Sequence, residues 1–431
     1  MAQKILETEI AIVGSGTAGA TLAKELSKAG KKVLLIEKGA RETRLGRMRD
    51  GLRFYEKHTF QKSIDGTLLY GTNMVGGTSV VASGNALRCS QKELLDLGID
   101  LESHFIDAER ELNAAPLPDK CISPGALKLL ESAEALGLGP KRIPKFINPN
   151  KCRICGHCVM GCKYNAKWSA ANYVDAAVKN GASLMTKTRV TRVLSSHGRV
   201  QGLEAIGPDG QLKIMSHIVI VSCGGLQTPI LLQRSGITRA GRQMFCDPWM
   251  TTYGITKNLN QVPGVNAPGY VHKPGRFILF PVIDPPIQFM LYTGLRPLSG
   301  RFPRERALGL MTKIADDSAG KVNADGSIEK PITSQDKEKF NEGNRLVREI
   351  LIKAGADPKS LFTMKQIRGP HPGGTAAIGE VVDNMLETEI KNLFVCDNSV
   401  LPKAPGLPPI LTLIALSKWL AKRLAADNQK L

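Results

Sequence analysis

The chain has 431 residues, of which 42% are hydrophobic and 23% charged, a composition that excludes collagen, coiled coils and disordered chains. This length provides for two or three domains with a well-buried core. The net charge of +19 is typical of a solvated basic surface, or of a protein that binds an anionic substrate, an acidic carrier protein or an anionic membrane surface. Nucleic acid is a poor fit as a partner, because the sequence has no groove-reading or base-stacking motif.

The apolar segments of the chain are too short to cross a bilayer. The longest, ILTLIALSKWLAKRLA, is interrupted by Lys418, Lys422 and Arg423. The N-terminus enters an apolar strand within its first residues and shows no signal peptide. We therefore expect a cytoplasmic protein with no transmembrane segment, for which contact with a membrane would be peripheral.

The first predicted elements are a strand, a glycine-rich turn, a helix and a second strand, within EIAIVGSGTAGATLAKELSKAGKKVLLIEKG. Gly14 permits the tight turn, Gly16 lets the backbone approach a pyrophosphate, and Gly19 allows the helix to touch the strand. Glu37 ends the second strand, about 20 residues further on, where an acidic side chain binds ribose hydroxyls. The unit predicts a dinucleotide site, FAD or NAD, whose contacts also include Thr17, Ala18 and Lys38.

Three later segments carry a further pattern: YGTNMVGGTSVVASGNALR at 70–88, IVIVSCGGLQTPILLQRSGI at 218–237, and HPGGTAAIGEVVDN followed by NLFVCDNSVLPKAPGLPPILTLIALSKWLAKRLA at the C-terminus. In order and spacing they resemble the GMC (glucose–methanol–choline) oxidoreductases, a family of FAD enzymes. The resemblance implies FAD as the cofactor. It also implies cofactor contacts from Gly76, Gly77, Thr78, Ser79, Val190, Cys223, Gly224, Asp397, Pro408 and Pro409.

The same resemblance implies an α/β fold with a Rossmann-like, doubly wound FAD-binding domain that is discontinuous in sequence. We expect this domain in residues 1–145, 166–240 and 370–431. A smaller α+β substrate domain would occupy 241–369, and residues 146–165 would form an inserted iron–sulfur loop. The substrate domain is short for the family, which favours an open pocket, a partner subunit or an oligomer that completes it.

The inserted loop carries four of the nine cysteines, with the C-x2-C-x2-C-x3-C spacing of bacterial ferredoxins. Cysteines clustered in a chain without a secretory context usually bind metal. We expect a [4Fe–4S] cluster; a structural zinc site, with His157 as a candidate ligand, and inert thiols are the alternatives. The expected ligands are Cys152, Cys155, Cys158 and Cys162.

The fourth ligand is the least determined. Lys163 follows the last cysteine where ferredoxins have proline, and the chain has no second cysteine run to share ligands with. We therefore assign Cys162 to the same cluster. The competitors for this role are Cys246, Cys121, Cys89 and an external ligand.

His371 is the candidate catalytic residue. It matches the histidine that faces the flavin in GMC enzymes, where it would accept the hydroxyl proton while hydride leaves for flavin N5. Imidazole suits this role because its unperturbed pKa lies near neutrality. The alternative is a structural histidine held in its loop by Pro370 and Pro372.

The family's second catalytic residue, a His or Asn near the start of the last helix, is missing. Pro408 or Pro409 stands there, and proline offers neither a proton donor nor a base. His371 would then act alone or with Asn398 or Lys403, or the chemistry would differ.

A flavin accepts two electrons as hydride, whereas an iron–sulfur cluster passes them singly. Together they predict an FAD-dependent dehydrogenase that takes hydride from the CH–OH group of a small molecule and passes single electrons to an acidic carrier such as a ferredoxin. One alternative is reduction of a C=C or C=O bond by electrons entering through the cluster, and another is an electron-transfer subunit without its own substrate. A basic surface for docking would include Arg41, Arg44, Arg47, Arg49, Arg53, Lys57 and Lys62.

Overall fold

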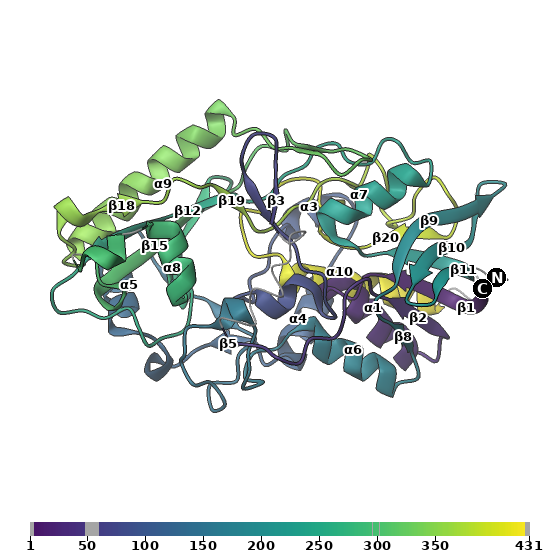
Figure 1. Cartoon of the computed structure of the whole chain (residues 1–431), viewed down its shortest axis with the longest axis horizontal. Helices are drawn as coiled ribbons and strands as arrows, with labels where there is room; N and C mark the ends of the chain where they lie inside the picture. The colour runs from purple at the N-terminus through teal and green to yellow at the C-terminus, as the bar shows by residue number, and fades with distance from the viewer. Residues whose placement is uncertain (1–3, 48–59, 295, 301, 427–431) are drawn as a thin grey trace.

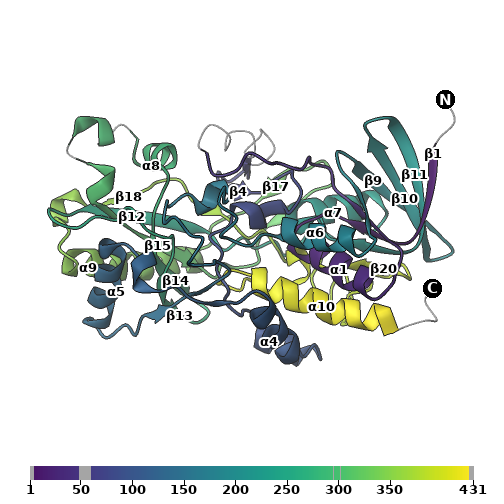
Figure 2. The same cartoon turned by 90° about the horizontal axis from the view of Figure 1, so that it is seen from below.

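Two β-sheets lie one after the other along the long axis of the molecule (Figure 1). The computed structural model describes residues 4–47, 60–294, 296–300 and 302–426. The first and the last described elements belong to the same sheet-and-helix layer, so the N-terminal and C-terminal parts of the chain are packed together (Figure 2). This arrangement agrees with a cofactor domain that is discontinuous in sequence.

The first sheet is mostly parallel. Its strands are β1 (Lys4–Val13), β2 (Val33–Ile36), β8 (Ser183–Met185), β9 (Arg189–Ser196), β10 (Arg199–Gly207), β11 (Gly210–Val221) and β20 (Leu393–Val395). Their order is β8-β2-β1-β11-β10-β9, with β20 pairing with the C-terminal part of β11. Ile12 lies opposite Leu35 on one side and Ile220 on the other. The C-terminal parts of the central strands, residues 10–13 and 218–221, are apolar and buried because helices cover the sheet there.

Helices cover this sheet. They are α1 (Thr17–Lys28), α3 (Gln91–Asp96), α4 (Glu102–Glu111), α6 (Ala170–Lys179), α7 (Gly224–Arg234) and α10 (Ile410–Ala426). α10 runs beside α1 and α4 (Figure 2), and the ammonium of its buried Lys418 pairs with Glu25, Asp107 and Glu111 of those two helices. Within the described chain, none of the helices combines the length and the hydropathy that a bilayer crossing requires.

The second sheet is largely antiparallel. Its strands are β3 (Phe60–Lys62), β4 (Leu68–Tyr70), β6 (Lys141–Arg142), β12 (Trp249–Ile255), β13 (Gly269–Lys273), β14 (Phe277–Val282), β15 (Ala307–Ile314), β18 (Phe362–Thr363) and β19 (Arg368–Gly369). They follow the order β3-β4-β19-β12-β15-β14-β13-β6, with β18 against β12. Three strands of this sheet, β3, β4 and β6, come from outside residues 241–369. The substrate-side layer is therefore larger than the segment that the sequence assigned to it.

Three helices accompany the second sheet: α5 (Pro124–Glu134), α8 (Pro286–Thr293) and α9 (Ser334–Lys353). α9 packs on β12, β14 and β15, where Val347 and Leu351 are buried against Phe277 and Leu279. The opposite face of β12, β14 and β15 is turned toward the first sheet and carries the side chains described below.

Short elements connect the two layers. β5 (Ala115–Pro116) pairs with β7 (Pro144–Lys145), and β16 (Lys321–Val322) pairs with β17 (Ile328–Glu329). The four-cysteine loop follows β7 and, as described, contains one 3-10 turn, Cys158–Met160. This turn contacts another 3-10 turn, Gly77–Val81, which lies at the first sheet. The cysteine loop is thus anchored to the predicted cofactor side of the molecule.

Candidate active site

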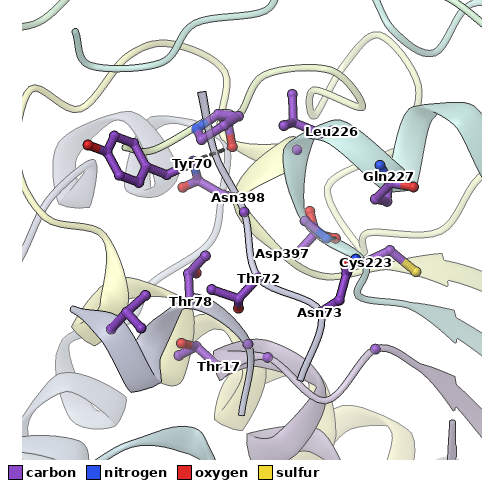
Figure 3. A pocket seen from close by; sticks show the side chains of 18 of the residues that line it. Thr17, Tyr70, Thr72, Asn73, Thr78, Cys223, Leu226, Gln227, Asp397 and Asn398 are labelled. Atoms are coloured by element: carbon purple, nitrogen blue, oxygen red, sulfur yellow. Dashed lines mark hydrogen bonds between the residues drawn. The ribbon is translucent and has the colours of Figure 1, made fainter. Parts of the chain in front are cut away.

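A cavity of about 940 Å³ lies between the two sheets. It begins at the carboxyl ends of β1 and β2, where open α/β sheets bind ligands, and continues along the facing side of the second sheet. In Figure 3, Thr17 and Thr78 lie on one side of it and Asp397 and Cys223 on the other, while Tyr70 lies at the far end from Thr17. Its volume is near the upper end of the range for ligand pockets, about 300–1,000 Å³, as a large cofactor with a substrate requires.

Most of the residues predicted to contact the cofactor line this one cavity, although they come from distant parts of the chain. They are Gly14, Gly16, Thr17, Ala18, Glu37, Lys38, Gly77, Thr78, Val190, Cys223, Gly224, Asp397, Pro408 and Pro409, and His371 lines it as well.

Three of the predicted contact residues lie behind the lining. A Cβ added at Gly19 would stand 1.9 Å from the carbonyl oxygen of Gly14, so this glycine lets helix and turn touch. The amide of Gly76 donates to the hydroxyl of Ser15 (3.2 Å), and the hydroxyl of Ser79 donates to the carbonyl of Gly76 (2.6 Å). These residues shape the wall behind the lining.

The turn between β1 and α1 fits a pyrophosphate. Gly14 has φ +100°, which favours glycine, and Gly16 is the N-cap of α1, where no side chain among the described residues caps the helix. A Cβ at Gly16 would meet no described atom within 4 Å, because it would point into the cavity. The free N–H groups of the first helical turn and the helix dipole therefore favour an anion at this position.

Two buried carboxylates hold the turns at this end of the cavity. Glu37 accepts hydrogen bonds from the amide (3.1 Å) and hydroxyl (2.7 Å) of Ser15. Asp397 accepts from the amide of Gly224 (2.8 Å) and the hydroxyl of Thr228 (2.6 Å). Each carboxylate oxygen has two lone pairs, so both groups retain capacity to accept a cofactor hydroxyl.

His371 is joined to a buried aspartate. Its Nδ1 lies 2.9 Å from Oδ2 of Asp247, which is fully buried. The other oxygen, Oδ1, accepts from the amide of Gly406 (2.8 Å). We assign the ring proton to Nδ1, because a carboxylate can only accept it, and this leaves Nε2 as a proton acceptor.

A lysine completes this group. Nζ of Lys313, on β15, lies 3.3 Å from Nδ1 of His371 and 3.5 Å from Oδ2 of Asp247, and Lys313 lines the cavity. Burial, with the charge of Lys313, lowers the pKa of His371 to about 4, against the opposing effect of Asp247. Burial also lowers the pKa of Lys313, which Asp247 opposes. His371 is therefore unprotonated at neutral pH, and its Nε2 is free to accept a proton.

Asn398 and Lys403, which the sequence suggested as partners of His371, make other contacts. The side-chain amide of Asn398 donates to the backbone carbonyls of His371 (3.0 Å) and Pro372 (2.9 Å), so it holds the histidine loop in place. Lys403 forms an ion pair with Glu93 (2.9 Å) away from the cavity.

Sequence reasoning missed Asp247 and Lys313. The one available signal was a lysine inside the otherwise apolar strand ALGLMTKI.

The four cysteines of the loop line a second, much smaller cavity together with His157. All four are free thiols, Cys155 is exposed and the other three are partly buried. Across the described residues, no three His, Cys, Asp or Glu side chains come close enough to hold a single metal ion. Burial raises the pKa of Cys152 to about 11.

Two buried lysines lie between this loop and the large cavity. Lys167 donates to the backbone carbonyls of Ser79 (3.1 Å) and Val80 (3.0 Å), and Lys145 donates to that of Asn266 (2.7 Å). Both ammonium groups lower the pKa of Cys158, although its burial raises that pKa more. The structure thus places two lysine side chains beside the thiols, although burial lowers the pKa of both, that of Lys145 to about 7.

Of the competing fourth ligands, only Cys121 is close to the loop, where it packs against Cys152 and Cys158. Cys89 contacts Thr412 and Cys246 lies near Asp316, both in the core.

Comparison with known proteins places this geometry in a family. Models of the N-terminal and C-terminal parts of the GMC oxidoreductases match residues 9–263 and 311–417. The chain belongs to the GMC oxidoreductase family. As a GMC oxidoreductase it is FAD-dependent and acts on CH–OH groups.

Relatives of this GMC oxidoreductase span nearly its full length. An uncharacterized protein of Methanocaldococcus jannaschii is 30% identical over 95% of this chain and 98% of the relative. The long-chain-alcohol oxidase FAO4B of Arabidopsis thaliana is 24% identical over 98% of this chain and 68% of the relative.

Solved structures show the same fold. Formate oxidase of Aspergillus oryzae matches with a TM-score of 0.77 and 14% identity, covering 99% of this chain and all of that one. Pyridoxine 4-oxidase from Mesorbium loti matches with a TM-score of 0.75 and 17% identity, covering 96% and 99%. The family, the flavin and the α/β fold expected from the sequence are confirmed; the iron–sulfur cluster, the acceptor and the role of His371 stay predictions.

Proposed function

We propose that this GMC oxidoreductase is a dehydrogenase that oxidises an alcohol and delivers the electrons singly, through a [4Fe–4S] cluster, to a carrier protein. The observation that carries the proposal is that two adjacent residues line two different cavities. Cys158 lines the small cavity of the cysteine loop, and its neighbour Val159 lines the large one. A cluster in the loop would therefore lie next to the flavin site.

The alcohol half of the reaction rests on His371. FAD, when bound, would supply the acceptor for the hydride that leaves the carbinol carbon. Nε2 of His371 takes the hydroxyl proton, and the carboxylate of Asp247 stabilises the resulting imidazolium.

The wall next to this centre indicates the kind of substrate. Trp249, Phe280, Val282 and Met311 give it an apolar surface. Relatives of this chain include long-chain-alcohol oxidases and a cholesterol oxidase. Both observations favour an alcohol with an apolar body.

The cysteine loop fits an iron–sulfur cube better than a zinc ion. Cys152, Cys155, Cys158 and Cys162 would hold the cluster, which would supply one-electron transfer. Their C-x2-C-x2-C-x3-C spacing is that of bacterial ferredoxins, whereas zinc sites more usually have two CxxC pairs separated by a longer loop. The protonated side chains of Lys167 and Lys145 would stabilise the cluster's net negative charge, and that charge would in turn favour the protonated lysines.

The surface around the loop favours an acidic electron carrier. Cys155 is exposed, and exposed cationic side chains lie in the same loop and in the segment next to it: Arg44, Arg47, Lys151, Arg153 and Lys163. Gly46 of that segment donates its amide to the carbonyl of Met160 (2.8 Å), which holds the two segments together. Arg49, Arg53 and Lys57 of the basic stretch lie outside the described residues.

Anaerobic purification tests the proposal. We expect FAD with about four irons and four sulfides per chain, bleaching of the flavin by alcohols with apolar bodies, and reduction of an added ferredoxin. Flavin without iron, or zinc in its place, would refute the cluster. If the enzyme turns over only when reduced ferredoxin supplies electrons for reduction of a carbonyl or alkene, then the physiological reaction runs in the opposite direction, as a reduction.

The fourth ligand is tested by two matched variants. Cys162→Ser should lose most of the iron, whereas Cys121→Ser, at the buried thiol next to the loop, should keep it. The opposite result would assign the ligand to Cys121.

A further inference from the structure

We propose that Lys313 is a second catalytic residue of this enzyme, and that its buried ammonium stabilises the negative charge that develops on the substrate oxygen beside His371. The inference rests on the proposed role of His371 at the flavin. It supplies a donor that the last helix lacks, since Pro408 and Pro409 occupy the place of the family's second His or Asn. The replacement comes from the facing sheet instead.

The position of Lys313 is unusual for a lysine. Its side chain is 1% exposed, and it lies at the centre of the second sheet, where β15 pairs with β12 and β14. Its backbone neighbours across the sheet are Trp249 and Ile278, both apolar. Lysine is almost never fully buried unless it is paired, so this position calls for an explanation.

A structural ion pair with Asp247 explains the burial only in part. Nζ of Lys313 is 3.5 Å from Oδ2 of Asp247, longer than the contacts that Asp247 receives from His371 (2.9 Å) and from the amide of Gly406 (2.8 Å). Both carboxylate oxygens thus have a closer donor. By contrast, Lys330 is equally buried but lies 3.0 Å from Asp316 and donates to two backbone carbonyls as well. An ammonium carries three protons, and Lys313 has donors left for a ligand in the cavity that it lines.

Chemistry assigns the role. When the O–H bond of the alcohol breaks, its proton goes to Nε2 of His371, and negative charge grows on the substrate oxygen while hydride leaves the carbon with two electrons. The substrate is oxidised to a carbonyl compound, and the flavin is reduced. A buried ammonium next to this oxygen stabilises the charge most in the transition state, because few waters screen it. Removing one such donor typically costs about 10²–10³-fold in rate.

A probe that needs neither an alcohol nor a cluster separates this inference from the proposed function. Sulfite adds to oxidised flavins and leaves a negative charge in the same part of the site, and its binding is followed by loss of flavin absorbance. In the FAD-loaded, full-length Lys313→Met protein we expect the Kd for sulfite to rise by about tenfold or more, equivalent to about 1.4 kcal/mol. Lys313→Arg, which keeps the charge, should stay within about threefold of the parent.

The control is Lys339→Met, the same change at a lysine on α9 that bonds the carbonyl of Ala315 outside the cavity. Its sulfite affinity should be unchanged. With an alcohol substrate, Lys313→Met should lower kcat by about 10²-fold and leave KM nearly constant, because the attraction between the ammonium and the substrate oxygen strengthens as negative charge develops.

Equal sulfite affinity in the parent and Lys313→Met would overturn the inference, and so would an equal loss in Lys339→Met. If Lys313→Met does not fold, Lys313→Gln provides the same test with a neutral side chain of similar reach. Lysine-dependent sulfite binding without alcohol oxidation would contradict the proposed function but not the charge that Lys313 provides.

Discussion

The large cavity and the cysteine loop of this molecule are built in opposite ways. In the cavity between the sheets, the carboxylates of Glu37, Asp247 and Asp397 are already held by hydrogen bonds from the chain. In the cysteine loop, burial raises the pKa of Cys152 and Cys158, so the neutral thiols are favoured without metal. The chain shapes the first site by itself, whereas the second would require its cofactor to draw the thiolates together.

Replacing His371 should give the largest effect and tests whether the cavity is an active site at all. His371→Ala removes the base, and we expect kcat/KM for alcohol oxidation to fall by about 10³-fold with the fold and FAD content unchanged. The rate of flavin bleaching in a single turnover measures this loss of activity. His272→Ala, at an exposed histidine on β13, is the control. A similar loss in both variants would contradict a specific role for His371.

The glycines of the first turn test whether the chain shapes the cofactor site without its ligand. Gly16→Ala should leave the apoprotein folded, because the added Cβ meets no described atom within 4 Å, yet weaken FAD binding by about 10²-fold by blocking the pyrophosphate. Fluorescence titration of the apoprotein with FAD measures this. Gly19→Ala should instead unfold the apoprotein, because its Cβ would overlap the Gly14 carbonyl at 1.9 Å. Equal FAD affinity for Gly16→Ala and the parent would contradict the placement of the pyrophosphate.

Lys167 sharpens the comparison because it belongs to both regions. Lys167→Met removes the ammonium that donates to the carbonyls of Ser79 and Val80, and we expect a loss of about 2 kcal/mol in the free energy of unfolding and a lower iron content. Urea unfolding and an iron assay measure the two effects. Lys163→Met, at an exposed lysine of the same loop, should change neither by much. A comparable loss in both variants would show that loop charge in general, not this buried contact, is responsible.

The pH dependence should show the smallest effect near neutrality. Because burial and Lys313 lower the pKa of His371 to about 4, the acid limb of kcat/KM should lie near pH 4, with less than about a twofold change between pH 8 and 5.5. An acid limb near pH 6.5 would contradict this environment.

The free energy of unfolding should depend on pH through the same residue, His371. In the unfolded chain His371 takes up its proton near pH 6.5, whereas in the folded chain it does so near pH 4. The folded state binds fewer protons in this window, so its stability should decrease as the pH falls from about 6.5 to 4. Urea midpoints of the parent and His371→Asn should therefore converge toward pH 4.

Local patterns were enough to locate the cofactor side of the molecule. Strand–turn–helix units place their glycines by short-range sterics, so Gly14, Gly16 and Gly19 are readable without any tertiary contact. The sequence also located His371, through its resemblance to the family. It misjudged the size of the substrate-side layer, because β3, β4 and β6 join that sheet by pairing with strands far away in the chain.

By itself, then, the sequence determined the dinucleotide turn, the family and the spacing of the four cysteines, since each depends on residues within a few positions of one another. Only the tertiary structure decided which groups surround His371. Asp247 and Lys313 are 124 and 58 residues away from it in the chain, and they meet it because two sheets enclose one cavity. No local periodicity encodes that meeting, because burial and charge pairing between distant segments arise only when both sheets have formed.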